Sequence, residues 1–307
     1  MADPVLHIKD CYYFEVPKVM WQHNYESADE VPSWLREAHP EATAAEFNRD
    51  LAGKILIPQP FGTPKNLYES ASGFCISKFM ILEVVVAILL IVIFRRVAQS
   101  MQQDPAPRGK FRNLFEAMLL FVRDQIVRPA IGRGFEEFVP LLWTLFFFIL
   151  GLNLMGLIPC LGTATGAFGT TITLASVTLA TGLWCGSKKL GIVGYWTNMA
   201  PPLPAIYLPL TAFVFVIEVA GMLIKHTVLG VRLLANMVAG HLVLLSLLGI
   251  IVSAAGSGFY SWLAVVVIGV CGSTLFSVLE LGVAALQAYV FTFLSALFIG
   301  AAIHHHH

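Results

Sequence analysis

The sequence predicts an all-α integral membrane protein. Of its 307 residues, 57% are hydrophobic and 12% are charged, whereas a soluble domain carries about 25% charged residues. Apolar runs long enough to form membrane helices recur between residues 79 and 303. We expect N-terminal membrane helices, an amphipathic surface helix, and a C-terminal hairpin of two long, steeply tilted helices.

Residues 1–78 form a polar N-terminal segment that precedes the membrane domain, 79–303. The segment holds seven Lys/Arg and eleven Asp/Glu, together with seven prolines. Residues 29–47 are compatible with a short helix, and PQPFGTP at 58–64 is typical of an extended linker. Four aromatic residues indicate either a small packed patch or contact with a membrane surface, although a soluble extension without such a role is the favoured interpretation. The four aromatic residues are Tyr12, Tyr13, Phe14 and Trp21.

The first membrane helix is expected over residues 79–94, where Arg95 and Arg96 close it. Residues 95–133 hold eight Lys/Arg against three Asp/Glu, so the positive-inside rule places this loop in the cytoplasm and the N-terminal segment outside. Within it, residues 111–127 carry apolar side chains at helical spacing, which predicts an amphipathic helix along the cytoplasmic surface. The apolar positions are 111, 114, 115, 118, 119, 122 and 126, and Arg112, Glu116, Arg123 and Asp124 fill the other side.

Two further crossings are expected, over residues 138–158 and 170–185. The first carries Asn153, a polar side chain at membrane depth, which on residues alone is compatible with a helix–helix hydrogen bond. The second is followed by Lys188 and Lys189. This basic end is again expected in the cytoplasm, so both basic segments agree on orientation.

Two apolar stretches of more than 40 residues follow, about 205–252 and 259–303. As one helix each would run ~65 Å, against ~30 Å for the hydrocarbon core. Each stretch is therefore either two crossing helices or one steeply tilted helix. We favour the tilted hairpin, because Gly230 and residues 269–273 are only weak candidates for a turn.

The last hundred residues contain few charges, and three of them share a helix face. Glu218, Lys225 and Arg232 are seven residues apart, two helical turns. A charge at the bilayer centre costs at least ~3 kcal/mol, so it often marks an ion path. Arg232 is then either an ion-path residue or half of a buried pair with Glu280 or Glu218. The stripe continues with small residues: Ala235, Asn236, Ala239 and Gly240.

Other polar residues lie off this stripe. His241 is nine residues past Arg232, about half a turn around the helix, so we expect it to face into the protein, toward the last helix. Its unperturbed pKa near 6.5 suits proton transfer, although a core histidine is an equal alternative. Lys225 is also compatible with snorkelling to a surface. In the last helix, Glu280, Ala284, Gln287 and Phe291 share a face.

The motif GVRLLANMVAGH at 230–241, followed by ELGVAALQAYVFTFLSALF at 280–298, resembles subunit a of the F-type rotary ATP synthase. GKF at 109–111 and NLMGLIP at 153–159 extend the resemblance, which covers about residues 72–303. It implies that Arg232 is the essential arginine and that the tilted hairpin faces a c ring. It also implies roles in proton translocation for Asn236, Gln287, the pair His241 and Glu280, Asn153 near the outer half-channel, and Glu218 and Lys225 near the cytoplasmic half-channel.

The resemblance further implies a proton-conducting stator subunit that is not an enzyme on its own. Expected partners are the c-subunit ring, the b subunits of the peripheral stalk, the remaining ATP synthase subunits and the lipid bilayer, with no nucleic acid. The expected location is a bacterial inner membrane. No cofactor or metal is implied, the five cysteines show no metal spacing, and residues 304–307 form a histidine tail with no assigned function.

Two other classes remain as alternatives. A secondary transporter would show paired internal repeats with interrupted helices. An intramembrane hydrolase would carry a metal motif such as HExxH or a nucleophile–base pair. We find neither pattern in the sequence.

Overall fold

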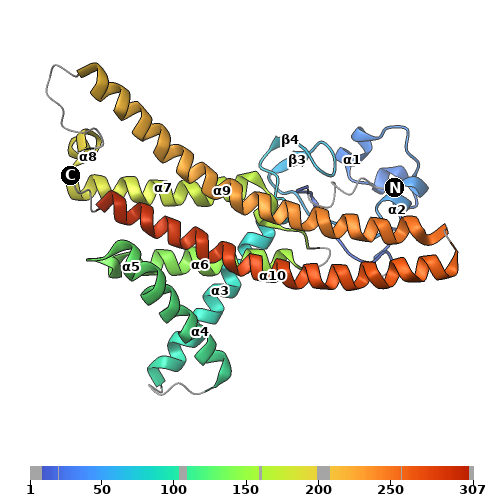
Figure 1. Ribbon diagram of the computed structural model, residues 1–307. Helices are drawn as coiled ribbons and strands as arrows, with labels where there is room; N and C mark the ends of the chain where they lie inside the picture. Colours follow the sequence, from blue (N-terminus) through green and yellow to red (C-terminus); the bar gives the residue numbers. More distant parts are fainter. Residues whose placement is uncertain are drawn as a thin grey trace. The chain divides into compact units, whose positions relative to one another are not determined.

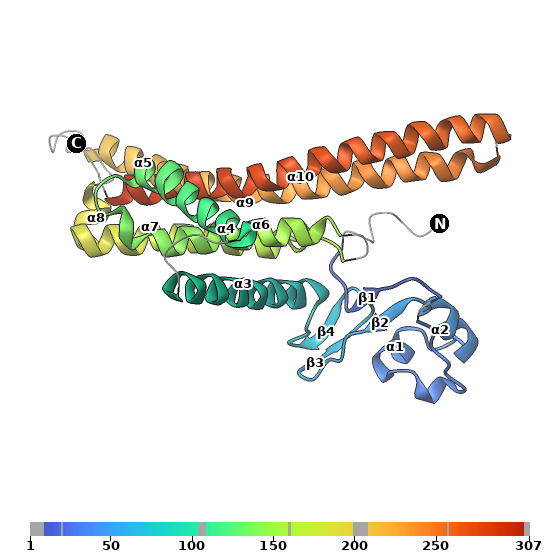
Figure 2. The ribbon, with the colours of Figure 1, turned by 90° about the horizontal axis from the view of Figure 1, so that it is seen from below.

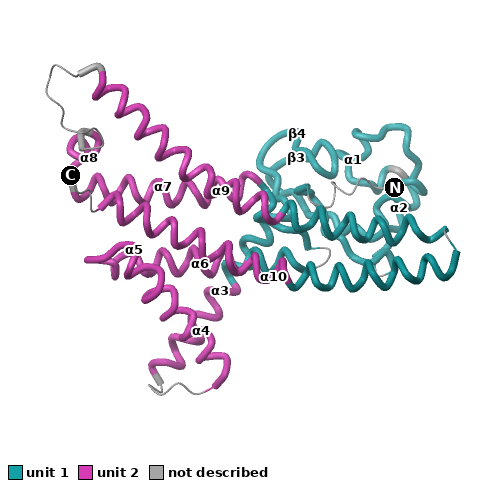
Figure 3. Tube along the Cα trace, viewed as in Figure 1, with its two compact units in different colours: residues 1–88, 152–167, 238–278 teal, residues 89–151, 168–237, 279–307 magenta. Residues whose placement is uncertain are grey.

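The computed structural model describes residues 9–19, 21–103, 109–158, 161–198, 208–256 and 258–303, and most of them are helical (Figure 1). The chain divides into two compact units, each assembled from three segments (Figure 3). The first comprises Met1–Ile88, Leu152–Ala167 and Val238–Val278, and the second Leu89–Gly151, Phe168–Met237 and Leu279–His307.

The N-terminal part of the first unit is a small mixed module (Figure 2). Strand β1 (Tyr13–Glu15) pairs antiparallel with β2 (Lys54–Leu56), and β3 (Gly62–Pro64) with β4 (Ser70–Gly73). Its helices are η2 (Ala28–Glu30), α1 (Ser33–Ala38) and α2 (Ala44–Asp50), and α2 starts with a capping box. Its core consists of Val31, Leu35, Phe47 and Leu51.

Two expectations for this module change. Residues 62–64 are not part of a linker, because they form β3; Pro64 is tolerated at the end of a two-stranded sheet, where a missing N–H costs little. The single short helix expected in 29–47 is divided into α1 and α2 around Pro40, which disfavours helix at the residue before it. The packed-patch interpretation holds for Tyr13, which is buried and hydrogen-bonded to Tyr68 at 2.8 Å.

Helix α3 (Lys78–Gln103) begins where the first membrane helix was expected. Its first turn is capped by the Asp10 carboxylate, which accepts the N–H groups of Phe79 and Cys11; burial raises the pKa of this carboxyl. The expected end at residue 94 is wrong, since the helix continues through Arg95 and Arg96. Arginine and glutamine are good helix formers, so a basic pair does not stop a helix.

The segment expected as one amphipathic helix is α4 (Lys110–Phe121), a π-helical turn η3 (Val122–Val127) and α5 (Arg128–Ile131). The N–H of Arg128 donates to the carbonyl of Arg123, an i→i+5 bond. The next residue, Pro129, has no N–H, so the hydrogen-bond register can change there without losing a donor.

The predicted polar and apolar sides of α4 are wrong at its start. Arg112 is 6% exposed, whereas Phe111 and Leu114 are exposed. The Arg112 guanidinium donates to the Ser100 carbonyl at 3.1 Å and lies 3.8 Å from Glu116. Ser100 is in the last turn of α3, where carbonyls lack helical partners, and this unmet acceptor draws the arginine inward.

In the rest of the described chain, the helices are η4 (Phe135–Glu137), α6 (Val139–Gly156), η5 (Ala164–Gly166), α7 (Phe168–Leu190), α8 (Ile192–Asn198), α9 (Leu208–Ser253), η7 (Ala254–Gly256) and α10 (Phe259–Ile303). Among the described residues, four helices have the length and composition of membrane spans: α6, α7, α9 and α10. The protein is thus an all-α membrane protein, as predicted. Helix α3 is not one of these four, and its crossing stays a prediction.

Each long apolar stretch is one helix, of 46 residues in α9 and 45 in α10. This confirms one long helix over two crossing helices in each stretch. In the first unit the two helices run side by side to the turn at η7 (Figure 2). An added Cβ at Gly269 would lie 2.6 Å from Ile251, so the glycine permits close approach there. The tilt in a membrane stays a prediction.

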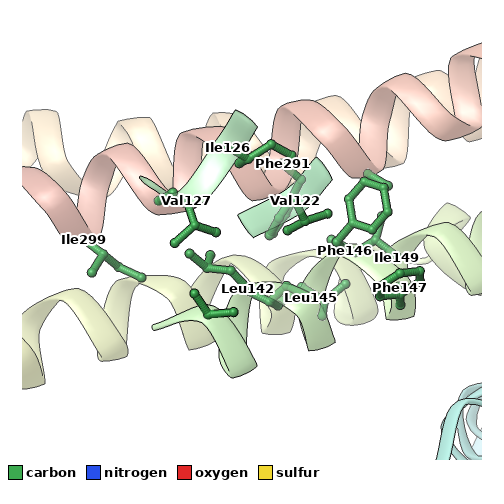
Figure 4. Packing of buried hydrophobic residues seen from close by; sticks show 14 of the residues in the cluster. Val122, Ile126, Val127, Leu142, Leu145, Phe146, Phe147, Ile149, Phe291 and Ile299 are labelled. Carbon is green, nitrogen blue, oxygen red and sulfur yellow. The ribbon is translucent and has the colours of Figure 1, made fainter. Parts of the chain in front are cut away.

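The core of the second unit lies between η3, α6 and α10 (Figure 4). Val122, Ile126 and Val127 pack with Leu142 of α6 and Phe291 of α10, and all five are almost completely buried. Each such side chain contributes about 1.5–3 kcal/mol through burial. The indole N–H of Trp143 also donates to the Leu119 carbonyl of α4. The apolar side of 111–127 therefore packs largely on protein, where the sequence indicated a membrane surface.

Candidate functional site

The charged stripe predicted on α9 is exposed. Glu218, Lys225 and Arg232 are all exposed, as are Ala235 and Ala239 beyond them, whereas Asn236 is half-buried and Gly240, expected on the same stripe, is buried. The buried side of the same helix is formed by Leu229, Leu233 and Met237, which are spaced by four residues.

Arg232 forms no ion pair with any residue that the structure describes. The alternative of a structural pair with Glu280 or Glu218 is therefore not formed within the described chain. A guanidinium stays charged at any working pH. A charged group on the outer face of a membrane helix is costly unless it is paired or reaches water.

Gln287 of α10 contacts α9 at Arg232, from the buried side of α9. Its side-chain N–H donates to the backbone carbonyl of Arg232 at 3.4 Å. Gln287 is 3% exposed and Glu280 4% exposed, and they share the buried face of α10 with Ala284 and Phe291, as their spacing predicted. Arg232 and Gln287 are thus brought together, with the arginine side chain outside and the glutamine inside.

A second polar group gathers in the first unit at the end of α6. Asn153 is fully buried, and its carbonyl oxygen accepts the Thr165 hydroxyl at 2.8 Å. The Thr165 hydroxyl lies 3.1 Å from that of Thr163, which is also fully buried. The sequence did not indicate a role for these threonines, because threonine in a Gly/Thr-rich turn is too common to indicate a site.

His241 joins the same end of α6. Its Nε2 lies 3.1 Å from the carbonyl oxygen of Gly156, one helical turn after Asn153. A carbonyl only accepts, so Nε2 carries the proton and Nδ1 is the acceptor in a neutral ring. The turn packs nearby too, since an added Cβ at Gly166 would lie 3.8 Å from Val238, one turn before His241. His241 thus contacts α6 inside the protein and not the exposed stripe, as its position half a turn from Arg232 predicted. That it faces the last helix stays a prediction.

A third group lies in the second unit, where Glu218 and Lys225 line a cavity of about 90 Å³ together with His226. His226 is 6% exposed and was not among the residues predicted from sequence. The adjacent Lys225–His226 pair inside an apolar run was the signal that could have found it.

Two other predicted site features stay predictions. Asn236 lies one turn past Arg232 and is half-buried. His241 and Glu280 belong to different units, so their pairing stays a prediction. In the described ranges no three His, Cys, Asp or Glu side chains come together as a metal site requires, and Cys11, Cys75, Cys185 and Cys271 are free thiols. The histidine tail lies outside the described residues.

Comparison with known proteins gives consistent matches. The family model described as ATP synthase A chain matches residues 79–300. The chain is 38% identical over 252 residues to ATP synthase subunit a 2 of Chlorobaculum tepidum, covering 80% of this chain and 69% of that protein. It is 38% identical over 305 residues to ATP synthase subunit a of Anaeromyxobacter sp. (98% and 70%) and 35% identical over 289 residues to that of Chlorobium phaeobacteroides (91% and 81%). Every candidate site residue lies within the matched region.

Proposed function

The chain belongs to the ATP synthase A chain family, and on this premise we propose that it couples proton flow to rotation of a c ring through Arg232. It is a multi-pass membrane protein and a membrane-sector subunit of the ATP synthase complex. The observation that carries the proposal is the exposed Arg232 on a face of small residues, without an ion-pair partner in the described chain. Small residues let another helix pass close to the charge.

The partner of Arg232 is a carboxyl group on each subunit of the ring. In lipid such a carboxyl stays protonated, because desolvation raises its pKa. Opposite Arg232 it loses the proton, because a nearby cation stabilises the carboxylate. The guanidinium cannot give up its own charge, so it separates the loading step from the release step.

Two half-channels lead to this point from opposite sides. The outer one contains Asn153, His241 and Glu280, with the histidine and the glutamate acting as a coupled pair. The cytoplasmic one contains Glu218 and Lys225. Asn236 and Gln287 support Arg232, Asn236 from the next turn of α9 and Gln287 through the Arg232 carbonyl. His241 lies nine residues after Arg232 and Glu218 fourteen residues before it. The two paths reach the ring at different depths in the membrane, so a proton passes between them only when it is bound to a ring subunit and the ring rotates.

The same proposal assigns partners and location. The c ring faces α9 and α10, and the b subunits of the peripheral stalk hold the chain against it. The subunit is non-catalytic and lies in the bacterial inner membrane. Residues 1–78 form an extracytoplasmic segment and residues 79–303 the membrane domain. Co-purification with a c ring and b subunits distinguishes this assembly from a transporter that is complete alone.

Arg232→Ala is the central test. We expect it to abolish proton-driven ATP synthesis and to allow a passive proton leak, because nothing then separates the two half-channels. Arg232→Lys should also fail, since lysine can lose its proton when buried. The exchange Arg232→Gln with Gln287→Arg should keep part of the activity, because Gln287 already reaches the Arg232 backbone.

The measurements are ATP synthesis and proton pumping in membrane vesicles, with blots for assembly. Val228→Ala is the matched control, since Val228 is exposed one turn earlier on the same face. Normal synthesis by assembled Arg232→Ala would contradict the proposed function.

A further inference from the structure

His226 combines deep burial with an incompletely bonded ring. Its Nδ1 lies 2.9 Å from the Met222 carbonyl, and because a carbonyl only accepts, Nδ1–H is the donor. Nε2 is then an acceptor in the neutral ring. It is buried and has no hydrogen-bond partner among the described residues. Burying an acceptor without a partner is unfavourable, so a purely structural role does not explain this histidine.

The surroundings of His226 connect it to an exposed acid. The cavity of about 90 Å³ is lined by His226, Glu218, Lys225 and Tyr195. A cavity needs about 10–15 Å³ to hold one water, so this one has room for several. Glu218, Met222 and His226 are spaced by four and share one side of α9. The cavity follows this side from the buried imidazole to the exposed carboxylate.

The cavity also lies on one defined side of Arg232. His226 is six residues before Arg232, ~9 Å along the helix, whereas His241 is nine residues after it, ~14 Å away. Helix α7 contributes Gly182 and Leu183 to the lining, and the same helix ends in the basic pair expected in the cytoplasm. The cavity is therefore on the predicted cytoplasmic side.

The lining leaves one group suited to accept and release protons at neutral pH. The titratable and charged groups are Glu218, Lys225 and His226 on α9 and Tyr195 on α8, while α7 and α10 contribute only apolar residues. The His226 ring packs against Phe298 of α10, with centroids 4.6 Å apart and the ring planes tilted by 41°. Of these groups only histidine has an unperturbed pKa between 5 and 8.

We propose that His226 is a proton-relay residue of the cytoplasmic half-channel; this inference rests on the proposed function. Nε2 accepts one proton from a hydronium ion on the Arg232 side, which leaves water behind and converts the imidazole to imidazolium. The imidazolium then gives one proton to a water in the cavity, which becomes hydronium and passes the proton toward Glu218, and the neutral ring is restored. Nδ1–H stays on the Met222 carbonyl throughout, and no other bond forms or breaks.

The test uses the intact ATP synthase in membrane vesicles, measuring ATP synthesis and then passive proton flux after removal of the peripheral catalytic sector. We expect H226A and H226N to lower both about a hundredfold, the lower end of proton-transfer contributions. L179M, which changes the same cavity lining without removing a titratable group, should leave both unchanged. Added imidazole should restore flux in H226A, whereas pyrazole, which has the same size but is hardly basic, should not.

Two outcomes overturn the proposal. Normal flux in assembled H226N overturns it, and so does equal rescue of H226A by imidazole and pyrazole, which indicates packing. If H226A does not assemble, H226N decides, because its amide can still donate to the Met222 carbonyl. R232A is measured in parallel. Normal ATP synthesis in R232A contradicts the proposed function. If R232A is inactive and H226N is normal, the proposed function stands and only the relay role of His226 is overturned.

Discussion

Asn153 shows what a single polar side chain requires inside this protein. It is fully buried, and its side-chain oxygen is satisfied by the hydroxyl of Thr165, twelve residues later. Leaving a buried acceptor unsatisfied costs about 1–3 kcal/mol, so the turn after α6 must keep its conformation for Asn153 to stay inside. The residue predicted for the outer half-channel thus depends on a turn residue that the sequence did not single out.

Thr165→Val tests this dependence. The change keeps the shape and removes the donor, so we expect about 1–3 kcal/mol of destabilisation and a reduced proton flux. Thr165→Ser retains the hydroxyl and should behave like the unchanged protein. The measurements are the thermal unfolding of the purified complex and proton flux in vesicles. If the valine and serine variants behave identically, the Thr165–Asn153 hydrogen bond does not contribute to stability or proton flux.

At the scale of elements, glycines let the long helices α9 and α10 approach neighbouring helices closely. An added Cβ at Gly230 would lie 2.9 Å from the Thr171 carbonyl oxygen of α7 and 3.4 Å from the Ala175 Cβ. At Gly300 of α10, an added Cβ would lie 2.5 Å from the Ala130 carbonyl oxygen of α5. Gly230, at the start of the arginine motif, therefore fixes α9 against α7 two residues before Arg232.

Gly230→Val should disturb this contact. Overpacking of this kind typically costs about 1–3 kcal/mol, and here it also shifts the segment that carries Arg232. We expect less assembled complex and lower ATP synthesis per assembled complex. Gly221→Val is the matched control, because Gly221 is on the same helix and an added Cβ there meets nothing within 4 Å. Equal loss in both variants would indicate a general effect of valine in α9.

At the scale of the whole molecule, the charge distribution predicts the orientation in the membrane. The acidic segment 1–78 precedes α3, and the basic residues 95–133 follow its apolar part. The positive-inside rule uses this asymmetry. The rule predicts that the N-terminal module is extracytoplasmic and that the end of α3 is cytoplasmic.

Cysteine labelling in sealed cells tests the orientation. With the five native cysteines replaced by serine, Ser33→Cys should react with a membrane-impermeant reagent from outside. Gln102→Cys should react only after the cytoplasmic face is made accessible. Both positions are exposed on the protein surface. Labelling of both from the same side would exclude a single crossing between them.

Much of the fold follows from local properties of the sequence. The unbroken apolar runs of α9 and α10 contain no proline between residues 210 and 303, and helical hydrogen bonds are satisfied within the segment, so these helices need no partner to define them. The position of His241, half a turn from Arg232, also follows from helix geometry alone. That Glu218, Lys225 and Arg232 share one face was predictable for the same reason, whereas the exposure of this face was not.

Other features depend on which segments meet, and only the tertiary structure decided them. Arg112 is buried because the end of α3 offers it a carbonyl acceptor, and residues 62–64 form a strand because β4 lies beside them. His226 lines a cavity because α7, α8 and α10 close around it. A sequence pattern records the period of a helix or strand, whereas burial and hydrogen bonding across elements depend on contacts between residues far apart in the chain.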